Sequence, residues 1–446
     1  MMSFKRISYV LSAGVIFVSG FSASAEPVTW SKDVMPVVQE RCLNCHRPGQ
    51  VAPFSLETFD QARPWAKSIR EQVSTGKMPP YPGKPGEMPF HGDSNLSESE
   101  IFTFINWVDQ GAKQGNPADL PAKKVFKTHE GGWVNRVPDI VLQPEEPFTV
   151  GADVSDLYYC FKIPFSADQD LWLKSAEFQA GNNEVAHHFI LFEDTRGAFD
   201  ALDAETPEPG CECADMDRLA GANIVQMWAP GNVAPLSPEG VGLKLTKGKD
   251  LILQAHYYNA TGIDQIDHSR VALHLAQPEE TIDKQIRGMM VVQPNLDIKA
   301  GDANSEHTAT FTAFKDLTMY SVGGHMHLRG KSISQVAQLP DSDREMLMLD
   351  IPEYDFDWQF TYPFQEPWKF PAGTKFHMRS IHDNSSDNIN NPDPTKDVKW
   401  GLYSGDEMAF TGGSYTWDDE KLGIKPEPLS DSDRTRLTST SGDATD

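Results

Sequence analysis

Residues 251–258 read LILQAHYY, a short run of apolar and polar residues that lies between turn-forming stretches. Similar runs recur along the larger, second part of the chain, at residues 171–178, 186–193, 271–276, 308–314, 319–327 and 332–339. Short runs bounded by Gly, Pro, Asn and Asp, with no helical segments between them, are typical of antiparallel strands. The sequence therefore predicts antiparallel β-sandwiches, jelly-roll-like in form, in this part of the chain.

The residues ahead of these runs follow a helical pattern instead. Helix-like segments at 34–41, 55–75 and 97–111 alternate with turns rich in Pro and Gly, and the last segment begins with a Ser-x-x-Glu cap. The stretch GNPADLPAKK, residues 115–124, has the composition of a linker. About 300 residues beyond it exceed the usual size of one sandwich. We therefore expect a multidomain chain, with an all-α unit followed by two β-sandwiches.

The expected boundaries divide the chain into a signal peptide (1–25), a helical domain (26–124), a first β-sandwich (125–290), a second β-sandwich (291–429) and a disordered tail (430–446). Residues 1–25 consist of a basic start, an apolar stretch and a small-residue cleavage site that ends at Ala25. The alternative is an uncleaved membrane anchor, although the apolar stretch is short and interrupted. No later segment has the ~18 uninterrupted apolar residues of a membrane helix. We therefore expect a periplasmic or secreted protein without a membrane span after signal cleavage.

The overall charge narrows the range of partners. The chain has 446 residues, of which 64 are acidic and 39 are basic, and its formal net charge is -25. Nucleic-acid binding needs a basic surface, so this balance argues against a nucleic-acid partner.

A short motif in the helical part has the spacing of a covalent haem site. Residues 42–46 read CLNCH. In a CxxCH motif the two thiols bond to the haem vinyl groups, and the adjacent histidine supplies one axial nitrogen. Cys42, Cys45 and His46 therefore predict one haem c and a cytochrome c-like domain over residues 26–124. The alternatives are half of a zinc site or a redox CxxC, but no second CxxC follows.

The second axial ligand of this haem should be a methionine or histidine from a downstream loop. Met78 in GKMPPY, residues 76–81, is the best candidate, because the two prolines favour an extended loop. Met88 and His91 are its competitors. Three further cysteines, Cys160, Cys211 and Cys213, can form at most one disulfide bond, and their pairing is open.

The β part contains motifs with metal-ligating side chains. These are AHHFIL (186–191) with His187 and His188, LQAHY (253–257) with His256, GHMH (324–327) with His325 and His327, and GDEM (405–408) with Met408. The two histidines of GHMH share one face of a strand, because side chains repeat every second residue. Imidazoles combined with a thioether favour Cu(I) over zinc or iron. His377 and His382 have no partner motif, and we expect them to be structural or to lie behind the ligands.

In this order the motifs resemble the copper type II, ascorbate-dependent monooxygenase family, which includes peptidylglycine α-hydroxylating monooxygenase and dopamine β-monooxygenase. The resemblance covers roughly residues 145–415. It implies two coppers, an electron-transfer copper held by His187, His188 and His256, and a catalytic copper that binds dioxygen, held by His325, His327 and Met408. Gln254 also matches a family position beside the ligands. The stretches CHRPG, APFSL, RPWAKSIR and MPPY resemble cytochrome modules that are fused to bacterial members.

The chain departs from the peptide-hydroxylating branch at its substrate positions. Gly323 stands where that branch has an Arg that clamps the substrate carboxylate, and Phe410 and Gly412 replace a substrate-binding Asn and Tyr. A peptide with a C-terminal glycine is therefore not the expected substrate. Cys160 occupies a half-cystine position of the family, but no cysteine follows His256 closely, so the disulfide pattern of the family does not carry over directly.

These observations predict a copper-dependent monooxygenase that hydroxylates a C–H bond of a small organic substrate with O2. Electrons would enter through the haem from an external donor, because each turnover consumes two electrons and each copper holds one. The alternatives are a non-enzymatic periplasmic protein for haem and copper electron transfer or copper binding, and a cytochrome joined to a sugar- or protein-binding β-sandwich. The substrate, the electron donor and the oligomeric state cannot be read from the sequence.

Overall fold

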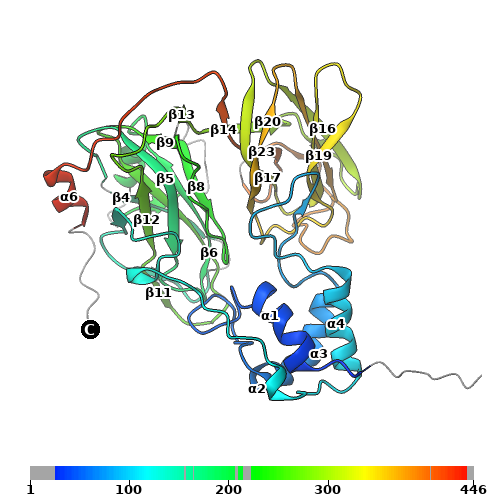
Figure 1. The fold of residues 1–446 in the computed structure, drawn as a ribbon. Coiled ribbons are helices and arrows are strands. Elements are labelled where there is room, and N and C mark those ends of the chain that lie inside the picture. The colour runs from blue at the N-terminus through cyan, green and yellow to red at the C-terminus, as the bar shows by residue number, and fades with distance from the viewer. Residues whose placement is uncertain are drawn as a thin grey trace, which may run out of the picture.

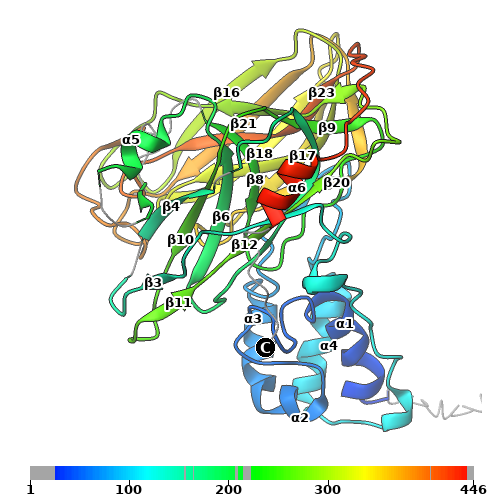
Figure 2. The same ribbon diagram turned by 90° about the vertical axis from the view of Figure 1, so that its left-hand side faces the viewer.

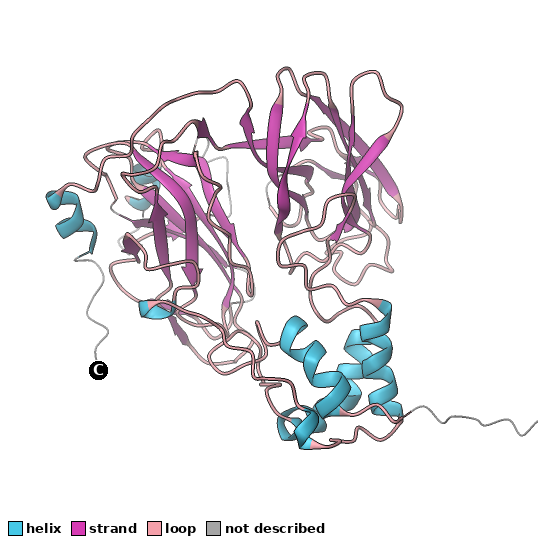
Figure 3. Cartoon of the chain, in the orientation of Figure 1, coloured by secondary structure: helices cyan, strands magenta, loops and turns pink. Residues whose placement is uncertain are grey.

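The computed structural model describes residues 26–154, 157–163, 165–205, 209–213, 222–401 and 403–438. The signal peptide expected over residues 1–25 lies outside the described residues. The structure is mostly β, with 35% strand and 14% helix. The helices α1 to α4 gather below two β regions (Figures 1 and 3), and the view turned by 90° shows the same separation (Figure 2).

The helices before residue 110 are short and share one small core. They are η1 (Trp30–Val34), α1 (Met35–Arg41), α2 (Phe59–Ala62), η2 (Arg63–Trp65), α3 (Ala66–Ser74) and α4 (Glu98–Asp109). The capping box predicted for α4 is present, because Ser97 and Glu100 bond to each other's backbone amides. The single helix expected over 55–75 is instead divided into α2, η2 and α3, and Pro64 lies at the division, where a proline starts a helical turn more readily than it continues one. Trp30, Phe104 and Trp107 are buried between these helices.

The expected fold class, an all-α cytochrome c-like domain followed by two antiparallel jelly-roll-like β-sandwiches, is wrong. The chain is mostly β throughout its larger part, its strands form small sheets, and the longest helix among the described residues, α4, has only 12 residues. The N-terminal part is not all α either, because β1 (Lys84–Pro85) pairs with β19 (Glu345–Ile351) and Phe90 forms a bridge with Phe364. The Pro- and Gly-rich stretch between α3 and α4 carries no periodicity that could have predicted this pairing.

The first β region contains two five-stranded sheets, in the orders β7-β4-β10-β6-β8 and β13-β9-β5-β12-β2. Their residues share one hydrophobic core. The strands of this region are β2 (Ile140–Leu142), β3 (Phe148–Val150), β4 (Leu157–Ile163), β5 (Leu171–Gln179), β6 (Ala186–Glu193), β7 (Cys211–Glu212), β8 (Asn223–Trp228), β9 (Val241–Leu245), β10 (Leu251–Tyr257), β11 (Gln265–Asp267), β12 (Arg270–Leu275) and β13 (Lys284–Gln285). The central strand β10 lies between β4 and β6, and its antiparallel register sets His256 opposite His188.

The second β region contains the sheets β1-β19-β18-β21-β16 and β14-β23-β17-β20, which share a second core. The remaining strands are β14 (Arg287–Val292), β15 (Asp297–Ile298), β16 (Ser305–Thr312), β17 (Leu317–Met326), β18 (Gly330–Gln338), β20 (Thr361–Phe370), β21 (Lys375–His382), β22 (Val398–Lys399) and β23 (Ala409–Trp417). Pairing of β17 with β23 sets Met326 opposite Ala409. The DEM motif therefore ends beside the HxH motif.

The expected disordered tail is wrong for residues 431–438, which form the helix α6 (Asp431–Thr438) against the first β region (Figure 1). Leu437 is only 1% exposed and lies in the first core with Leu429. The Asp433 carboxylate accepts a hydrogen bond from the Asp168 amide at 3.0 Å. Two buried leucines thus anchor a segment whose overall composition indicated disorder. Residues 439–446 lie outside the described residues.

One disulfide bond joins β4 to the residue after β7, between Cys160 and Cys213. This settles the open cysteine pairing and confirms the predicted disulfide. Such bonds persist in oxidising compartments, which agrees with an exported protein. In the part of the chain that the structure describes, every helix is too short or too polar to cross a membrane.

Candidate metal centres

The first candidate centre consists of His187 and His188 from β6 and His256 from β10, here named the HH set. One nitrogen from each imidazole lies within 4.8 Å of the others. The Nδ1 atoms of His187 and His256 are 3.0 Å apart. Three imidazole nitrogens at this separation suit a metal such as copper or zinc. The structure thus brings together all three residues that the first two motifs predicted.

An irregularity in β6 explains how adjacent histidines can converge. In a regular strand His187 and His188 would point to opposite faces of the sheet. Here the pairing with β10 passes from His188 opposite His256 directly to Ala186 opposite Tyr257, so His187 is left as an extra residue. Such a β-bulge turns the extra side chain toward the face of its neighbour. The sequence motif alone contains no signal for this bulge.

The surroundings of the HH set favour the uncharged form of His188. His256 is 5% exposed, and its ring stacks on Tyr158 with a centroid distance of 4.1 Å. Burial lowers the pKa of His188 well below its ordinary value, and the nearby imidazoles of His256, His187 and His325 lower it further. Neutral imidazole is the form that binds a metal. His188 can therefore bind a metal at neutral pH without first losing a proton.

The second candidate centre contains His325, His327 and Met408, and these three residues are here named the HxH set. The ring centroids of the two histidines are 5.1 Å apart. His325 Nδ1 lies 2.6 Å from Gln359 Oε1, and His327 Nδ1 lies 3.4 Å from the Asp406 carbonyl oxygen. Because these oxygens can only accept, both Nδ1 atoms carry the hydrogen, and Nε2 is left to bind a metal. Burial lowers the pKa of His325 to about 3 and that of His327 to about 4.

Glu407 ties Met408 to this pair. Its carboxylate is fully buried and accepts hydrogen bonds from the backbone amides of His327 at 3.0 Å, of Met408 at 3.2 Å and of Arg329. Burial raises the pKa of Glu407 to about 7, against the opposing effect of these hydrogen bonds. His382 Nε2 donates to the Met408 carbonyl oxygen at 3.3 Å. The expected place of His382 behind the ligands agrees with this contact, whereas the role of Glu407 was missed.

His377 lies farther from this centre. Its Nδ1 is 2.8 Å from the Thr310 hydroxyl, and its Nε2 is 3.4 Å from Gln338 Oε1. Both contacts join neighbouring strands, β21 to β16 and β21 to β18, which agrees with the structural role expected for His377.

The haem motif directly follows α1 and folds into a tight turn. The amides of Cys45 and His46 both donate to the Cys42 carbonyl oxygen, at 3.1 and 2.9 Å. Neither Cys42 nor Cys45 forms a disulfide bond. His46 Nδ1 is 3.0 Å from the Phe54 carbonyl oxygen, so Nε2 is the nitrogen left for an axial bond. Two thiols and one oriented imidazole therefore fit a c-type haem.

The three candidates for the second axial ligand lie in different surroundings. Met78 is 37% exposed and belongs to the loop that follows α3. Met88 packs against the core of the second β region, and the His91 amide donates to the Pro363 carbonyl oxygen at 2.7 Å. Both competitors are thus tied to the second β region. Met78 as the axial ligand stays a prediction.

The haem motif lies next to the HH set. Gly231 approaches Cys45 so closely that a Cβ at this position would lie 2.8 Å from Cys45 Sγ. A cavity of about 160 Å³ lies between the segment that contains the CxxCH motif, residues 42–54 and here named the haem segment, and His187 of the HH set. Its lining includes Val51 from the haem segment, His187 and Pro230 from the first β region, and Trp358 from the second. All three parts of the chain meet at this cavity.

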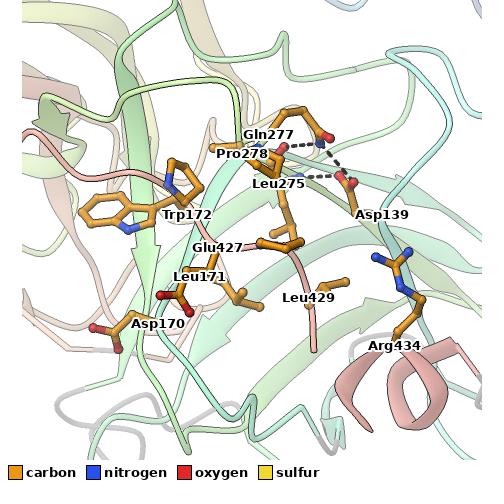
Figure 4. Close-up of a pocket in the computed structure, with 13 residues that line it drawn as sticks. Asp139, Asp170, Leu171, Trp172, Leu275, Gln277, Pro278, Glu427, Leu429 and Arg434 are labelled. Atoms are coloured by element: carbon orange, nitrogen blue, oxygen red, sulfur yellow. Dashed lines mark hydrogen bonds between the residues drawn. The ribbon is translucent and has the colours of Figure 1, made fainter. Parts of the chain in front are cut away.

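A larger cavity, of about 220 Å³, lies between the first β region and the segment that leads into α6 (Figure 4). Its lining includes Asp139, Trp172 and Arg434, and it contains no histidine or cysteine. The residues around it bond to one another, as Asp139 does with Gln277 and with the Leu275 amide. This cavity is a packing feature of the C-terminal segment.

Comparisons with known proteins do not indicate a function, so the function has to be inferred from the site itself. No protein family matches the chain, and no curated protein matches it. Among solved structures, a "putative secreted protein" from Eubacterium rectale is 10% identical over 63% of this chain and 75% of its own, with a TM-score of 0.19. Particles derived from infectious bursal virus give 11% identity over 65% of this chain and 70% of the other, with a TM-score of 0.18. Likenesses this weak carry no argument about this chain.

Proposed function

We propose that this protein is a copper-dependent monooxygenase that hydroxylates a C–H bond of a small organic substrate with O2. The observation that carries the proposal is the presence of two clusters of converging histidines in neighbouring β regions, one of them beside a CxxCH turn. His187, His188 and His256 would hold an electron-transfer copper. His325, His327 and Met408 would hold the copper at which oxygen binds. Copper supplies one-electron chemistry and an open position for O2 when it is bound there.

The side chains of the two sets prepare these sites. Burial lowers the pKa of His188, His325 and His327, so these imidazoles present lone pairs at neutral pH. Gln359 and the Asp406 carbonyl oxygen hold the far nitrogens of the HxH pair. The Met408 thioether favours Cu(I), the state from which oxygen is reduced. These contacts orient the metal-ligating atoms while no metal is bound.

The neighbourhood of His325 supports a small organic substrate. Phe410 lies against His325 with a ring distance of 4.9 Å, and Phe356 meets His327 edge-on at 6.2 Å. Gly323, where a carboxylate-clamping Arg stands in the peptide-hydroxylating branch, offers no charge. Aromatic walls of this kind suit an apolar reacting group better than a peptide carboxylate.

The haem segment supports an internal supply of electrons. Cys42 and Cys45 would attach one haem c, and His46 would bind its iron. Gly231 touches this segment, and the next residue back, Pro230, shares a cavity with His187. Electrons from an external donor would therefore enter at the haem and reach the HH set first. The disulfide bond and the signal sequence support a periplasmic or secreted location.

Metal and haem analysis of the purified full chain tests this proposal. We expect one c-type haem by pyridine haemochrome spectroscopy and two coppers by elemental analysis. Two zinc ions that copper cannot displace would contradict the proposal. The non-enzymatic alternative is separated by adding O2 to the reduced, copper-loaded protein together with a panel of small aromatic and aliphatic compounds. Reoxidation without any hydroxylated product from the panel would favour a protein that only transfers electrons or binds copper.

A further inference from the structure

One segment between β19 and β20, residues 354–360 (YDFDWQF), contacts both histidine sets and the N-terminal part of the chain. Its first residue, Tyr354, uses its hydroxyl to bond both backbone groups of Met326, donating to the carbonyl oxygen at 2.7 Å and accepting from the amide at 3.0 Å. Met326 is the residue between His325 and His327. At its other end Phe360 lies 5.6 Å from the ring of Tyr81. The segment is therefore held at both ends.

Gln359 contacts the HxH set directly, and the orientation of its amide is settled by a second contact. Its Nε2 donates to the Phe356 carbonyl oxygen at 2.8 Å. Its Oε1 therefore faces His325 Nδ1, at 2.6 Å. A carbonyl oxygen can only accept, so the hydrogen of the neutral His325 ring lies on Nδ1. The lone pair is left on Nε2, which is the nitrogen that can bind a metal.

Asp357, two residues earlier, stands near the HH set. Its Oδ1 lies 3.7 Å from His187 Nε2, while Nδ1 of the same ring faces His256. The Asp357 side chain is 71% exposed, so water weakens this attraction. Asp357 is thus close to Gln359 in the sequence but faces the other histidine set, and it provides a matched control for effects on His325.

We propose that Gln359 is a positioning residue that sets the tautomer of His325 and so makes Nε2 available for a metal. This inference rests on the proposed function only for the identity of the metal, because the tautomer is a property of the metal-free chain. Partners of this kind behind a ligating histidine fix its ring orientation, and their loss costs about 10- to 100-fold in metal affinity. A merely structural glutamine would leave the tautomer of His325 unchanged when replaced.

Nitrogen NMR of the metal-free full chain, labelled with 15N-histidine, tests the tautomer. In the wild type we expect the hydrogen of His325 on Nδ1, with the signal assigned by its loss in His325→Asn. Gln359→Met has a similar length but no acceptor, and we expect it to populate the Nε2–H form. Gln359→Glu keeps an acceptor and should retain the wild-type tautomer, as should Asp357→Asn. An Nε2–H ring in the wild type, or an unchanged ring in Gln359→Met, would overturn the proposal.

Competition for Cu(I) with a chelator of known affinity tests the consequence on the same proteins. Gln359→Met should bind the second copper at least about 10-fold more weakly, whereas Gln359→Glu should stay nearer to the wild type and Asp357→Asn should change this site little. Equal Cu(I) affinity in Gln359→Met and the wild type would overturn the positioning role. If the wild type bound no copper at all, the proposed function would fail, and the NMR measurement would still decide whether Gln359 sets the tautomer.

Discussion

The HH set and the HxH set use the same donor type but are built in different ways. His325 lies near the end of β17 and His327 directly follows the strand, so the two alternate residues can share a face. The HH set joins two strands and depends on the bulge at His187. The HxH rings leave Nε2 for a metal, whereas Nδ1 of His187 faces Nδ1 of His256. Two short histidine motifs with the same donor type thus produce sites that differ in geometry and in the imidazole nitrogen that is available to a metal.

The two sets also differ in what surrounds them. The HH set stacks on Tyr158 and lies beside the haem segment, through the cavity that His187 shares with Val51. The two histidines of the HxH set lie against Phe410 and Phe356, and the Glu407 carboxylate ties the backbone of Met408 to that of His327. In the proposed function, electrons arrive at the HH set and oxygen reacts at the HxH set. The substitutions predicted below each change one set and leave the other intact.

Removing one imidazole from either set should have the largest effect. His256→Ala should lose the copper of the HH set and His325→Ala that of the HxH set, each leaving one copper per chain and no oxygen-dependent hydroxylation. Neither residue lies in the haem segment, so the haemochrome spectrum should match the wild type. Elemental analysis and the spectrum together check this. Two coppers retained in either variant would show that the set is wrongly assigned.

Removing the thioether should affect the HxH set alone. Met408→Ala should weaken Cu(I) binding there by at least about tenfold, because a soft sulfur stabilises Cu(I) more than Cu(II). Hydroxylation should be lost, while Cu(I) binding by the HH set should match the wild type. Chelator competition measures both affinities. Full hydroxylase activity in this variant would place the oxygen site elsewhere.

The lowered pKa values predict an acid sensitivity of the metal-free fold. His325 and His327 have pKa values of about 3 and about 4 in the folded chain, against about 6.5 when unfolded. Below pH 6.5 the unfolded state binds more protons, so their contribution to stability is complete above pH 6.5 and is lost as the pH falls toward 4. We expect these two histidines to contribute a loss of about 2 to 5 kcal/mol between pH 6.5 and 4.5, which the raised pKa of Glu407 offsets in part.

Urea unfolding at several pH values measures this loss. The double variant His325→Gln, His327→Gln removes both titrating groups, and its stability should depend less on pH over the same window. A pH dependence identical to that of the wild type would mean that other groups cause the acid sensitivity.

Substitutions of the aromatic residues beside the two sets should have the smallest effects, and each should weaken copper binding by one set only. Tyr158→Leu removes the ring stacked on His256 and should weaken copper binding by the HH set about 2- to 10-fold. Phe410→Leu should do the same to the HxH set only. Chelator competition on both variants checks the separation. A loss at both sites from either change would show that the two sets are coupled through the fold.

Much of the site could be predicted from the sequence, because residue type and strand spacing are local properties. The run LILQAHYY became β10 almost in full, and the HxH pair stands at the end of β17, with His325 in the strand and His327 directly after it. The bulge at His187 could not be predicted, since it is a feature of pairing with β10. The same holds for β1, which pairs with a strand more than two hundred residues away.

The contacts behind the ligands escaped prediction for a similar reason. Gln359 follows His325 by 34 residues and lies in an irregular segment that has no periodicity. Glu407 stood in the quoted motif, but only the fold shows that its carboxylate collects three backbone amides. The helix α6 was misjudged because composition averages over the tail, whereas two leucines suffice to anchor it. Long-range contacts, rather than residue types, were the missing information.

Incorporation of 18O tests the central claim most directly. The haem and copper of the full chain are reduced, the reductant is removed, and 18O2 is added together with a substrate that scores in the panel. The account predicts one 18O atom in each hydroxylated product, oxidation of the haem in the same reaction, and no product from His325→Ala. Reoxidation of the metals without labelled product, or equal product from His325→Ala, would contradict it.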